Sequence, residues 1–164
     1  GASWKGYIES DGIERHQRPS LTWNNMCRNM NEREEEYARK IFELAQQEGI
    51  SLWLIGMPNP DYAHDHMYYN TLWSIAAEYG IQGVNYNDPN LRFGLRYSSD
   101  FADWQHLNVK GSVTFSKKLG ADLRTGLSVP DRRGDARYAS YDACAQTWFE
   151  KYPFFESSGV EGNE

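Results

Sequence analysis

Residues 50–57 form a nearly unbroken apolar run that is bounded by Gly49 and Pro58. The run is too short for a typical helix, and it has the length and composition of a strand that is buried on both faces of a sheet. Such strands belong to parallel sheets whose two faces are covered by helices. This feature therefore predicts an α/β fold with residues 50–57 as a central parallel strand.

The segment before this strand has the pattern of an amphipathic helix. Asn31 with Glu34 three residues later resembles a capping box, and Gly49 is placed as a helix stop, so a helix is predicted over about 31–47. Apolar residues at helical spacing predict the face that packs on the core: Tyr37, Ile41, Leu44 and Ala45.

The segment after the strand repeats the pattern of helix and strand. A helix is predicted over about 63–79 with Gly80 as its stop, followed by a strand over 81–86. A strand, a helix and a second strand joined by short links predict a right-handed parallel crossover.

Two more helices are predicted, over about 108–123 and 135–152, and a short extended piece over 4–9. Residues 156–164 are polar and are predicted to be a disordered tail. Because no repeat or second pattern is present, residues 1–164 are predicted to form a single three-layer α/β domain with a short parallel sheet flanked by helices.

The composition excludes several classes of function. The 164 residues carry a net charge of -6 without clustered Lys and Arg, which argues against nucleic acid as a partner. No apolar run is long enough to span a bilayer. Cys27 and Cys144 lie far apart without a C-x-x-C spacing, so neither a metal knuckle nor a redox motif is present. The two cysteines could pair, or they could be buried thiols.

The residue pair that indicates chemistry is Asp103 and His106, three positions apart on a loop before the helix that is predicted to begin at residue 108. In a Ser-His-Asp system, the histidine takes the proton of the nucleophile, and the carboxylate fixes its tautomer and stabilises the imidazolium. The spacing allows this contact within one turn of loop. The alternative is that Asp103 caps a turn and His106 forms only a local hydrogen bond.

The stretch D-F-A-D-W-Q-H-L-N-V-K-G at 100–111, with N-Y-N at 85–87 before it, resembles the last block of the SGNH (GDSL-like) hydrolase superfamily. The resemblance extends from about Glu36 to Trp148 and includes a strand that ends in Pro58. The segment D-R-R-G-D at 131–135 resembles the C-terminal tail of a bacterial branch of SGNH-like proteins. This branch is akin to relatives that transfer O-acetyl groups to polysaccharides or that transfer D-alanyl groups.

This resemblance implies a flavodoxin-like sheet and acyl-ester hydrolysis or acyl transfer, on a small acyl ester or an acylated carbohydrate. It implies that Asp103 is the orienting acid and His106 the general base, and it implies no cofactor. The nucleophilic serine of the family lies in a Gly-Asp-Ser-like block, and no serine here has that context, including Ser3 and Ser10.

The chain is therefore expected to be the C-terminal portion of such a hydrolase, which supplies the Asp-His pair and is inactive alone. Its short sheet should leave an edge that the N-terminal half or a second copy of the chain covers.

Three further residue groups have competing interpretations. Asn59, between two prolines after the strand, could contact substrate or form a turn. Trp104 could line an acyl pocket and shield Asp103, or it could only pack. His64 and His66 flank Asp65 at a spacing that some metal sites use, but a solvated surface is the more common role, so no metal is predicted.

The rival function is a non-catalytic α/β domain that binds a carbohydrate or a protein. In that case Asp103 and His106 only tie the loop together. The sequence assigns no cellular compartment.

Overall fold

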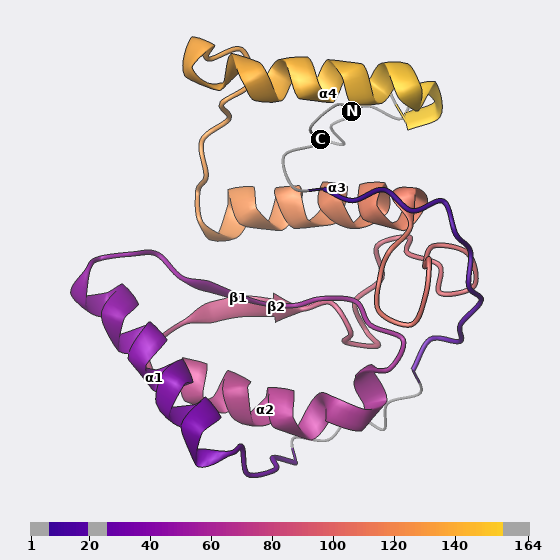
Figure 1. Cartoon of the computed structure of the whole chain (residues 1–164). Helices are drawn as coiled ribbons and strands as arrows, with labels where there is room; N and C mark the ends of the chain where they lie inside the picture. The colour runs from indigo at the N-terminus through magenta and orange to yellow at the C-terminus, as the bar shows by residue number, and fades with distance from the viewer. Residues whose placement is uncertain (1–6, 20–25, 156–164) are drawn as a thin grey trace. The chain divides into compact units, whose positions relative to one another are not determined.

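The computed structural model describes residues 7–19 and 26–155 (Figure 1). The chain divides into two compact units, Ser10–Leu127 and the combination of Gly1–Glu9 with Ser128–Glu164. Each unit is described by itself below. The single domain stays a prediction, and the predicted tail at 156–164 lies outside the described residues.

The larger unit contains a parallel sheet of two strands, β1 (Trp53–Gly56) and β2 (Gln82–Asn85), connected by the helix α2 (Tyr62–Glu78). In the register of the sheet, Trp53 lies opposite Gln82 and Gly56 opposite Asn85. The predicted parallel arrangement of strand, helix and strand is therefore confirmed.

Both strands are shorter than the predicted 50–57 and 81–86. All four residues of β1 are only half-buried, so the prediction of a strand buried on both faces is wrong. The physical reason is that β1 pairs with β2 alone among the described residues, which leaves its other edge open.

Helices lie on both sides of this sheet. Figure 1 shows α1 (Glu32–Gln47) and α2 on one side and α3 (Val109–Gly126) on the other, which is the arrangement of an α/β protein. The start of α3 is as predicted, because the side chain of Asn108 caps it by accepting the N–H of Gly111 at 3.0 Å. Its end lies beyond the predicted residue 123.

The ends of α1 also follow the sequence pattern. The side chain of Asn31 accepts the N–H of Arg33 at 2.9 Å, and Gly49 adopts a φ of 65° just past the helix. This left-handed conformation is the one that glycine adopts without steric cost.

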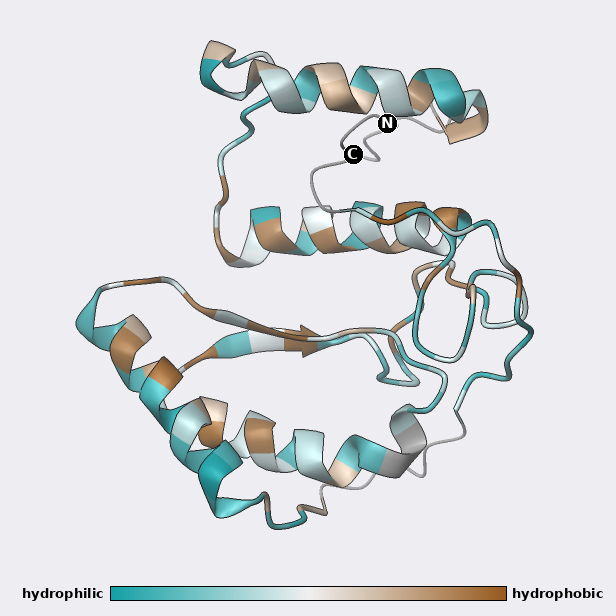
Figure 2. Ribbon diagram, in the orientation of Figure 1, coloured by the Kyte–Doolittle hydropathy of each residue, from teal (hydrophilic) through white to brown (hydrophobic). Residues whose placement is uncertain are grey.

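The face of α1 that packs on the core differs from the prediction in all but Ala45, which is buried as predicted. Phe42 is 4% exposed and forms a core with Ile75 and Ala76 of α2, whereas Ile41 is 56% exposed. Tyr37 and Leu44 are exposed like Ile41. Figure 2 shows that hydrophobic and hydrophilic residues alternate along α1 and α2. Two apolar stripes thus run along α1, and the stripe with Ala38, Phe42 and Ala45 is the one that is buried.

The smaller unit contains α4 (Ala139–Lys151), which is preceded by a 3₁₀ helix at Ala136–Tyr138 and followed by another at Pro153–Phe155. The predicted helix over 135–152 is therefore interrupted near its start. Trp148 packs against Tyr152 and Phe155, with ring centroids 4.9 and 5.7 Å apart.

The predicted extended piece over 4–9 falls partly on residues 4–6, which are outside the described residues. Its remaining residues, 7–9, form no strand. Among the helices of residues 7–19 and 26–155, none has the length and apolar character needed to cross a membrane.

Candidate active site

The Asp103–His106 pair lies on a loop that follows β2 and leads into α3. A single antiparallel bridge joins Phe101 to Leu107, and the N–H of Ala102 donates to the carbonyl of His106 at 2.8 Å. The bridge closes a short loop, so Asp103 and His106 are held on the same turn of chain.

The carboxylate of Asp103 contacts the imidazole of His106 directly. Nδ1 of His106 lies 2.9 Å from Oδ2 and 3.0 Å from Oδ1 of Asp103. The backbone N–H groups of Gln105 and His106 also donate to Oδ1, each at 2.8 Å. Asp103 therefore caps the turn and binds the ring at the same time, so both interactions considered for this residue are present.

These donors set the charge of the carboxylate. The backbone N–H of Gln105, and then the imidazole and backbone N–H of His106, lower the pKa of Asp103 from 3.8 to about 2. Asp103 is therefore ionised at neutral pH, and its carboxylate accepts a hydrogen bond from the protonated Nδ1 of His106. In that tautomer, Nε2 carries the lone pair that can act as a base.

The pair is open to solvent. The side chain of His106 is 73% exposed and that of Asp103 is 50% exposed. Within residues 7–19 and 26–155, Nε2 of His106 has no hydrogen-bond partner. The nitrogen that would act as the base is thus accessible to a reacting group.

A second carboxylate, Asp100, stabilises the start of the loop. It is almost fully buried and accepts the N–H of Arg96 at 2.8 Å and the hydroxyl of Ser99 at 2.7 Å. The ammonium of Lys110 lies 3.3 Å away. No role for Asp100 was predicted from the sequence, although Asp100 begins the stretch 100–111 that contains Asp103.

Asn108 stabilises the end of the loop. Besides capping α3, its side-chain amide donates to the carbonyls of Gly12 at 3.1 Å and Ser99 at 2.9 Å. Asn108 therefore joins the N-terminal segment of this unit to both ends of the loop. Only its capping role was evident in the sequence.

His16 is a further residue of the site that the sequence analysis missed. Its Nε2 donates to the backbone carbonyl of Asp103 at 3.1 Å, and its ring is buried. The ring packs against Trp104 and Phe101, with centroids 4.7 and 5.9 Å apart. No local pattern reveals this contact, because the two residues are far apart in the sequence.

Trp104 lies beside the pair and is 59% exposed. Its contact with His16 shows the packing role. A role in shielding Asp103, whose side chain is 50% exposed, stays a prediction. Its role as the wall of an acyl pocket stays a prediction.

Asn59 has the turn role. Its Oδ1 accepts the N–H of Asp61 at 2.8 Å, and its own N–H donates to Oδ1 of Asn87 at 2.8 Å. Asn87 also donates to the carbonyl of Met57 at 2.6 Å, so the segments that follow β1 and β2 are joined at this edge of the sheet. Contact of Asn59 with substrate stays a prediction.

His64 and His66 lie among the first five residues of α2, not in an extended segment. The geometric argument for a metal site at this spacing assumed an extended segment, so it does not apply here. In the described part of the chain, no group of three or more His, Cys, Asp or Glu residues could hold a metal ion. Cys27 is exposed and Cys144 is half-buried, and no disulfide joins them.

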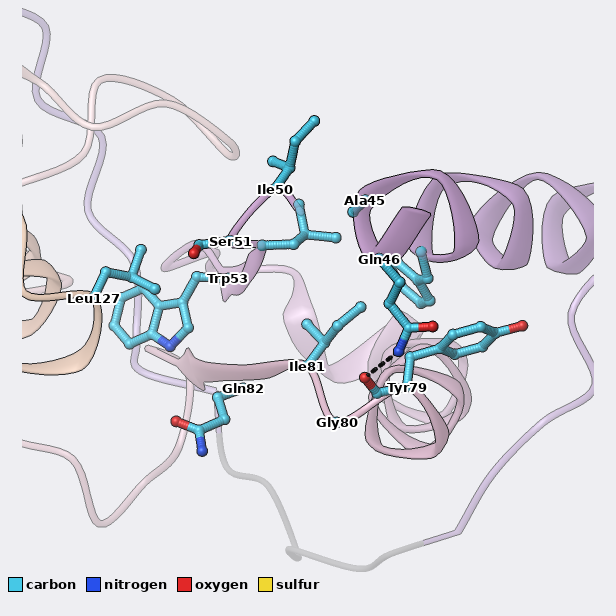
Figure 3. Close-up of a pocket in the computed structure, with 12 residues that line it drawn as sticks. Ala45, Gln46, Ile50, Ser51, Trp53, Tyr79, Gly80, Ile81, Gln82 and Leu127 are labelled. Carbon is cyan, nitrogen blue, oxygen red and sulfur yellow. Dashed lines mark hydrogen bonds between the residues drawn. The ribbon is translucent and has the colours of Figure 1, made fainter. Parts of the chain in front are cut away.

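A hollow of about 280 Å³ lies at the opposite end of the sheet, where β1 and β2 begin (Figure 3). It is lined in part by Gln46, Trp53 and Tyr79, and the amide of Gln46 donates to the carbonyl of Tyr79 at 2.9 Å. Among the described residues, its lining contains no carboxylate, histidine, cysteine or lysine. It therefore lacks the histidine and carboxylate groups that most often act in acid-base catalysis.

The loop can orient an imidazole, stabilise its protonated form and present Nε2 to a reacting hydroxyl or water. These are the functions of the base and the acid of a catalytic triad. No protein-family model, curated protein or solved structure matches the chain.

Proposed function

We propose that Asp103 and His106 are the orienting acid and the general base of an SGNH-type acyl-ester hydrolase or acyltransferase with a flavodoxin-like sheet. The observation that supports this most is the contact of Nδ1 with both carboxylate oxygens, at 2.9 and 3.0 Å, while Nε2 is accessible. The resemblance of residues 100–111 to the last block of the SGNH superfamily adds the reaction class.

In the proposed mechanism, Nε2 of His106 takes the proton of a serine hydroxyl as that oxygen attacks the acyl carbon. The ionised carboxylate of Asp103 stabilises the imidazolium that forms. The imidazolium then gives its proton to the leaving alcohol, and the acyl group stays on the serine as an ester. Nε2 next takes a proton from water or from an acceptor hydroxyl, whose oxygen attacks this ester, and the proton returns to the serine as the acyl group leaves. The substrate is a small acyl ester or an acylated carbohydrate, and the chemistry uses protein side chains without a cofactor.

The proposal places the nucleophile and the oxyanion donors on a segment outside the printed sequence. In the SGNH superfamily these groups lie in a Gly-Asp-Ser-like block and in blocks with Gly and Asn, and the 164 residues contain no Gly-Asp-Ser. No described residue outside β1 and β2 pairs with the sheet, so its edges provide a place where such a segment could pair, from the same protein or from a second chain.

The exposure of Asp103 and His106 favours a second function, that of a non-catalytic binding domain. Catalytic sites usually exclude water from the reacting groups, and the side chain of His106 is 73% exposed. If no further segment covers the loop, the chain is a non-catalytic domain that binds a carbohydrate or a protein, and the pair only stabilises the loop.

A fluorophosphonate probe distinguishes these functions, because it labels only an activated serine. The longest reading frame that encodes residues 1–164 should be labelled, and His106→Ala should lose the label. Gln105→Ala is the matched control, because Gln105 is exposed on the same loop and contributes only its backbone N–H to the site. No labelling of the full reading frame would favour the binding domain. Equal labelling of His106→Ala would show an activated serine that does not depend on His106 and would contradict its role as the base.

A further inference from the structure

A pocket of about 290 Å³ lies beside the segment that follows β2. Three arginines line it, Arg18, Arg92 and Arg96, and no acidic residue does so in the part of the chain that the structure describes. None of these arginines forms an ion pair within residues 7–19 and 26–155. The pocket therefore concentrates positive charge in a chain whose net charge is negative.

Arg18 is fixed on the wall of this pocket. Its Nη2 donates to the carbonyls of Asp88 at 2.7 Å and Leu91 at 3.0 Å. Its Nε, in contrast, is buried and has no acceptor among the described residues. One donor of an immobilised guanidinium is thus left without a partner.

Tyr97 supplies a second unpaired donor. The residue is 7% exposed, and its hydroxyl is buried without a hydrogen-bond partner in the described part of the chain. Burial raises the pKa of the Tyr97 hydroxyl, so the hydroxyl keeps its proton at neutral pH. Cζ of Arg18 lies 5.9 Å from the centre of the Tyr97 ring, which places the two unpaired donors on neighbouring side chains.

A buried donor without an acceptor is costly, and native proteins rarely leave two of them together. The guanidinium is permanently charged, and its N–H groups match the oxygens of carboxylate, phosphate and sulfate. Arg92 and Arg96 are exposed side chains that add charge around the same pocket. An anion is therefore the ligand group that would satisfy these donors.

The rest of the lining indicates the size and polarity of the ligand. Leu91, Phe93 and Leu95 provide apolar surface, and the ring of Phe93 packs against Tyr86 with centroids 5.7 Å apart. Gly94, between Phe93 and Leu95, has a φ of 84°, the left-handed conformation that lets the segment turn around the pocket. A volume of about 290 Å³ is at the small end of ligand pockets.

We infer that this pocket binds a small molecule that carries a carboxylate, phosphate or sulfate group on a compact apolar or ring-shaped body. The anionic group would accept from Nε of Arg18 and the hydroxyl of Tyr97. This site is separate in its residues from the Asp103–His106 pair, and the inference does not depend on the proposed hydrolase.

The test uses the three simplest anions as probes: inorganic phosphate, sulfate and acetate. Each is titrated into the ¹⁵N-labelled chain at constant ionic strength, with sodium chloride as the reference salt. At least one anion should cause saturable shifts of the backbone amides at residues 91–97, with a Kd of about 1 mM or tighter. The anion that binds most tightly identifies the class of the natural group. No saturable shift with any of the three would overturn the inference.

Two variants test the named donors. Tyr97→Phe removes only the unpaired hydroxyl and Arg96→Gln removes one charge, and each should weaken binding about tenfold. Arg124→Gln is the matched control, because Arg124 is exposed on α3 and does not line the pocket. The affinity of this variant for the anion should be unchanged. An equal loss in Arg124→Gln would show nonspecific charge attraction and would overturn the site. His106→Ala should bind the anion as tightly as the parent chain does, because neither Asp103 nor His106 lines the pocket.

Discussion

Nε2 of His16 lies 3.1 Å from the backbone carbonyl oxygen of Asp103, 87 positions later in the sequence. This hydrogen bond ties the N-terminal segment of the larger unit to the residue that orients His106. Because the ring of His16 is buried against Phe101 and Trp104, it fixes the loop by packing as well as by hydrogen bonding. We assign His16 the role of a positioning residue.

Replacing His16 by alanine should loosen the loop. The change removes one hydrogen bond and two ring contacts, so the free energy of unfolding should fall by about 1–3 kcal/mol. The amide signals of Gln105 and His106 and the Nδ1 signal of His106 should also shift in ¹⁵N NMR spectra. Gln17→Ala is the control, because Gln17 is an exposed neighbour. A loss of stability with unchanged signals of His106 would mean that His16 does not position the pair.

Two glycines of α3 provide a matched pair of substitutions. A Cβ at Gly111 would lie 2.0 Å from the carbonyl oxygen of Asp100, whereas a Cβ at Gly120 would meet no atom within 4 Å. Gly111→Ala should therefore destabilise the chain by about 1–3 kcal/mol and displace the loop. Gly120→Ala should stabilise it by about 0.5–1 kcal/mol, because alanine favours the helix. Urea unfolding measures both changes, and equal effects would contradict the close packing of α3 on the loop.

The hydrogen bonds to Asp103 predict a dependence of loop stability on pH. They lower the pKa of Asp103 from 3.8 to about 2 in the folded chain, so they favour its ionised form. Their contribution to stability is complete above pH 3.8 and is lost as the pH falls towards 2. The carboxyl carbon of Asp103, followed by ¹³C NMR, should titrate with a midpoint near 2.

A variant provides the control for this titration. Asp103→Asn cannot ionise, so the fall in the stability of the loop between these pH values should be smaller than in the parent chain. A midpoint at or above 3.8 in the parent chain would contradict the hydrogen bonding described for Asp103.

Neighbouring residues of α1 test which of its faces is buried. Phe42→Ala should lower the free energy of unfolding by about 3–5 kcal/mol, because the side chain is buried against Ile75 and Ala76. Ile41→Ala should change it by about 0.5 kcal/mol or less, because Ile41 is exposed. Thermal or urea unfolding measures both. A larger effect at Ile41 would restore the stripe that was predicted from the sequence.

Part of this structure was predictable because it depends on local sequence. The start of α1 at Asn31 and the start of α3 at Asn108 follow from side chains that cap the next turn. The parallel pairing of β1 and β2 follows from the short links on each side of α2. The contact between Asp103 and His106 follows from their spacing on one short loop.

The rest depends on which distant segments meet. Phe42 and Ile41 are adjacent and both apolar, so only the packing of α1 on α2 decides which is buried. The hydrogen bond from His16 to Asp103 and the pocket of Arg18 with Tyr97 join residues that are many positions apart. No periodicity in the sequence relates such residues.

The role of His106 as the general base of a serine hydrolase can be measured through the initial rate of p-nitrophenyl acetate hydrolysis. The protein encoded by the longest reading frame that contains these residues should show a saturable rate, which His106→Ala lowers by about 10²–10⁴-fold. The 164-residue chain by itself should show none, because it contains no Gly-Asp-Ser block. A saturable rate in the full reading frame that is unchanged in His106→Ala would contradict this role.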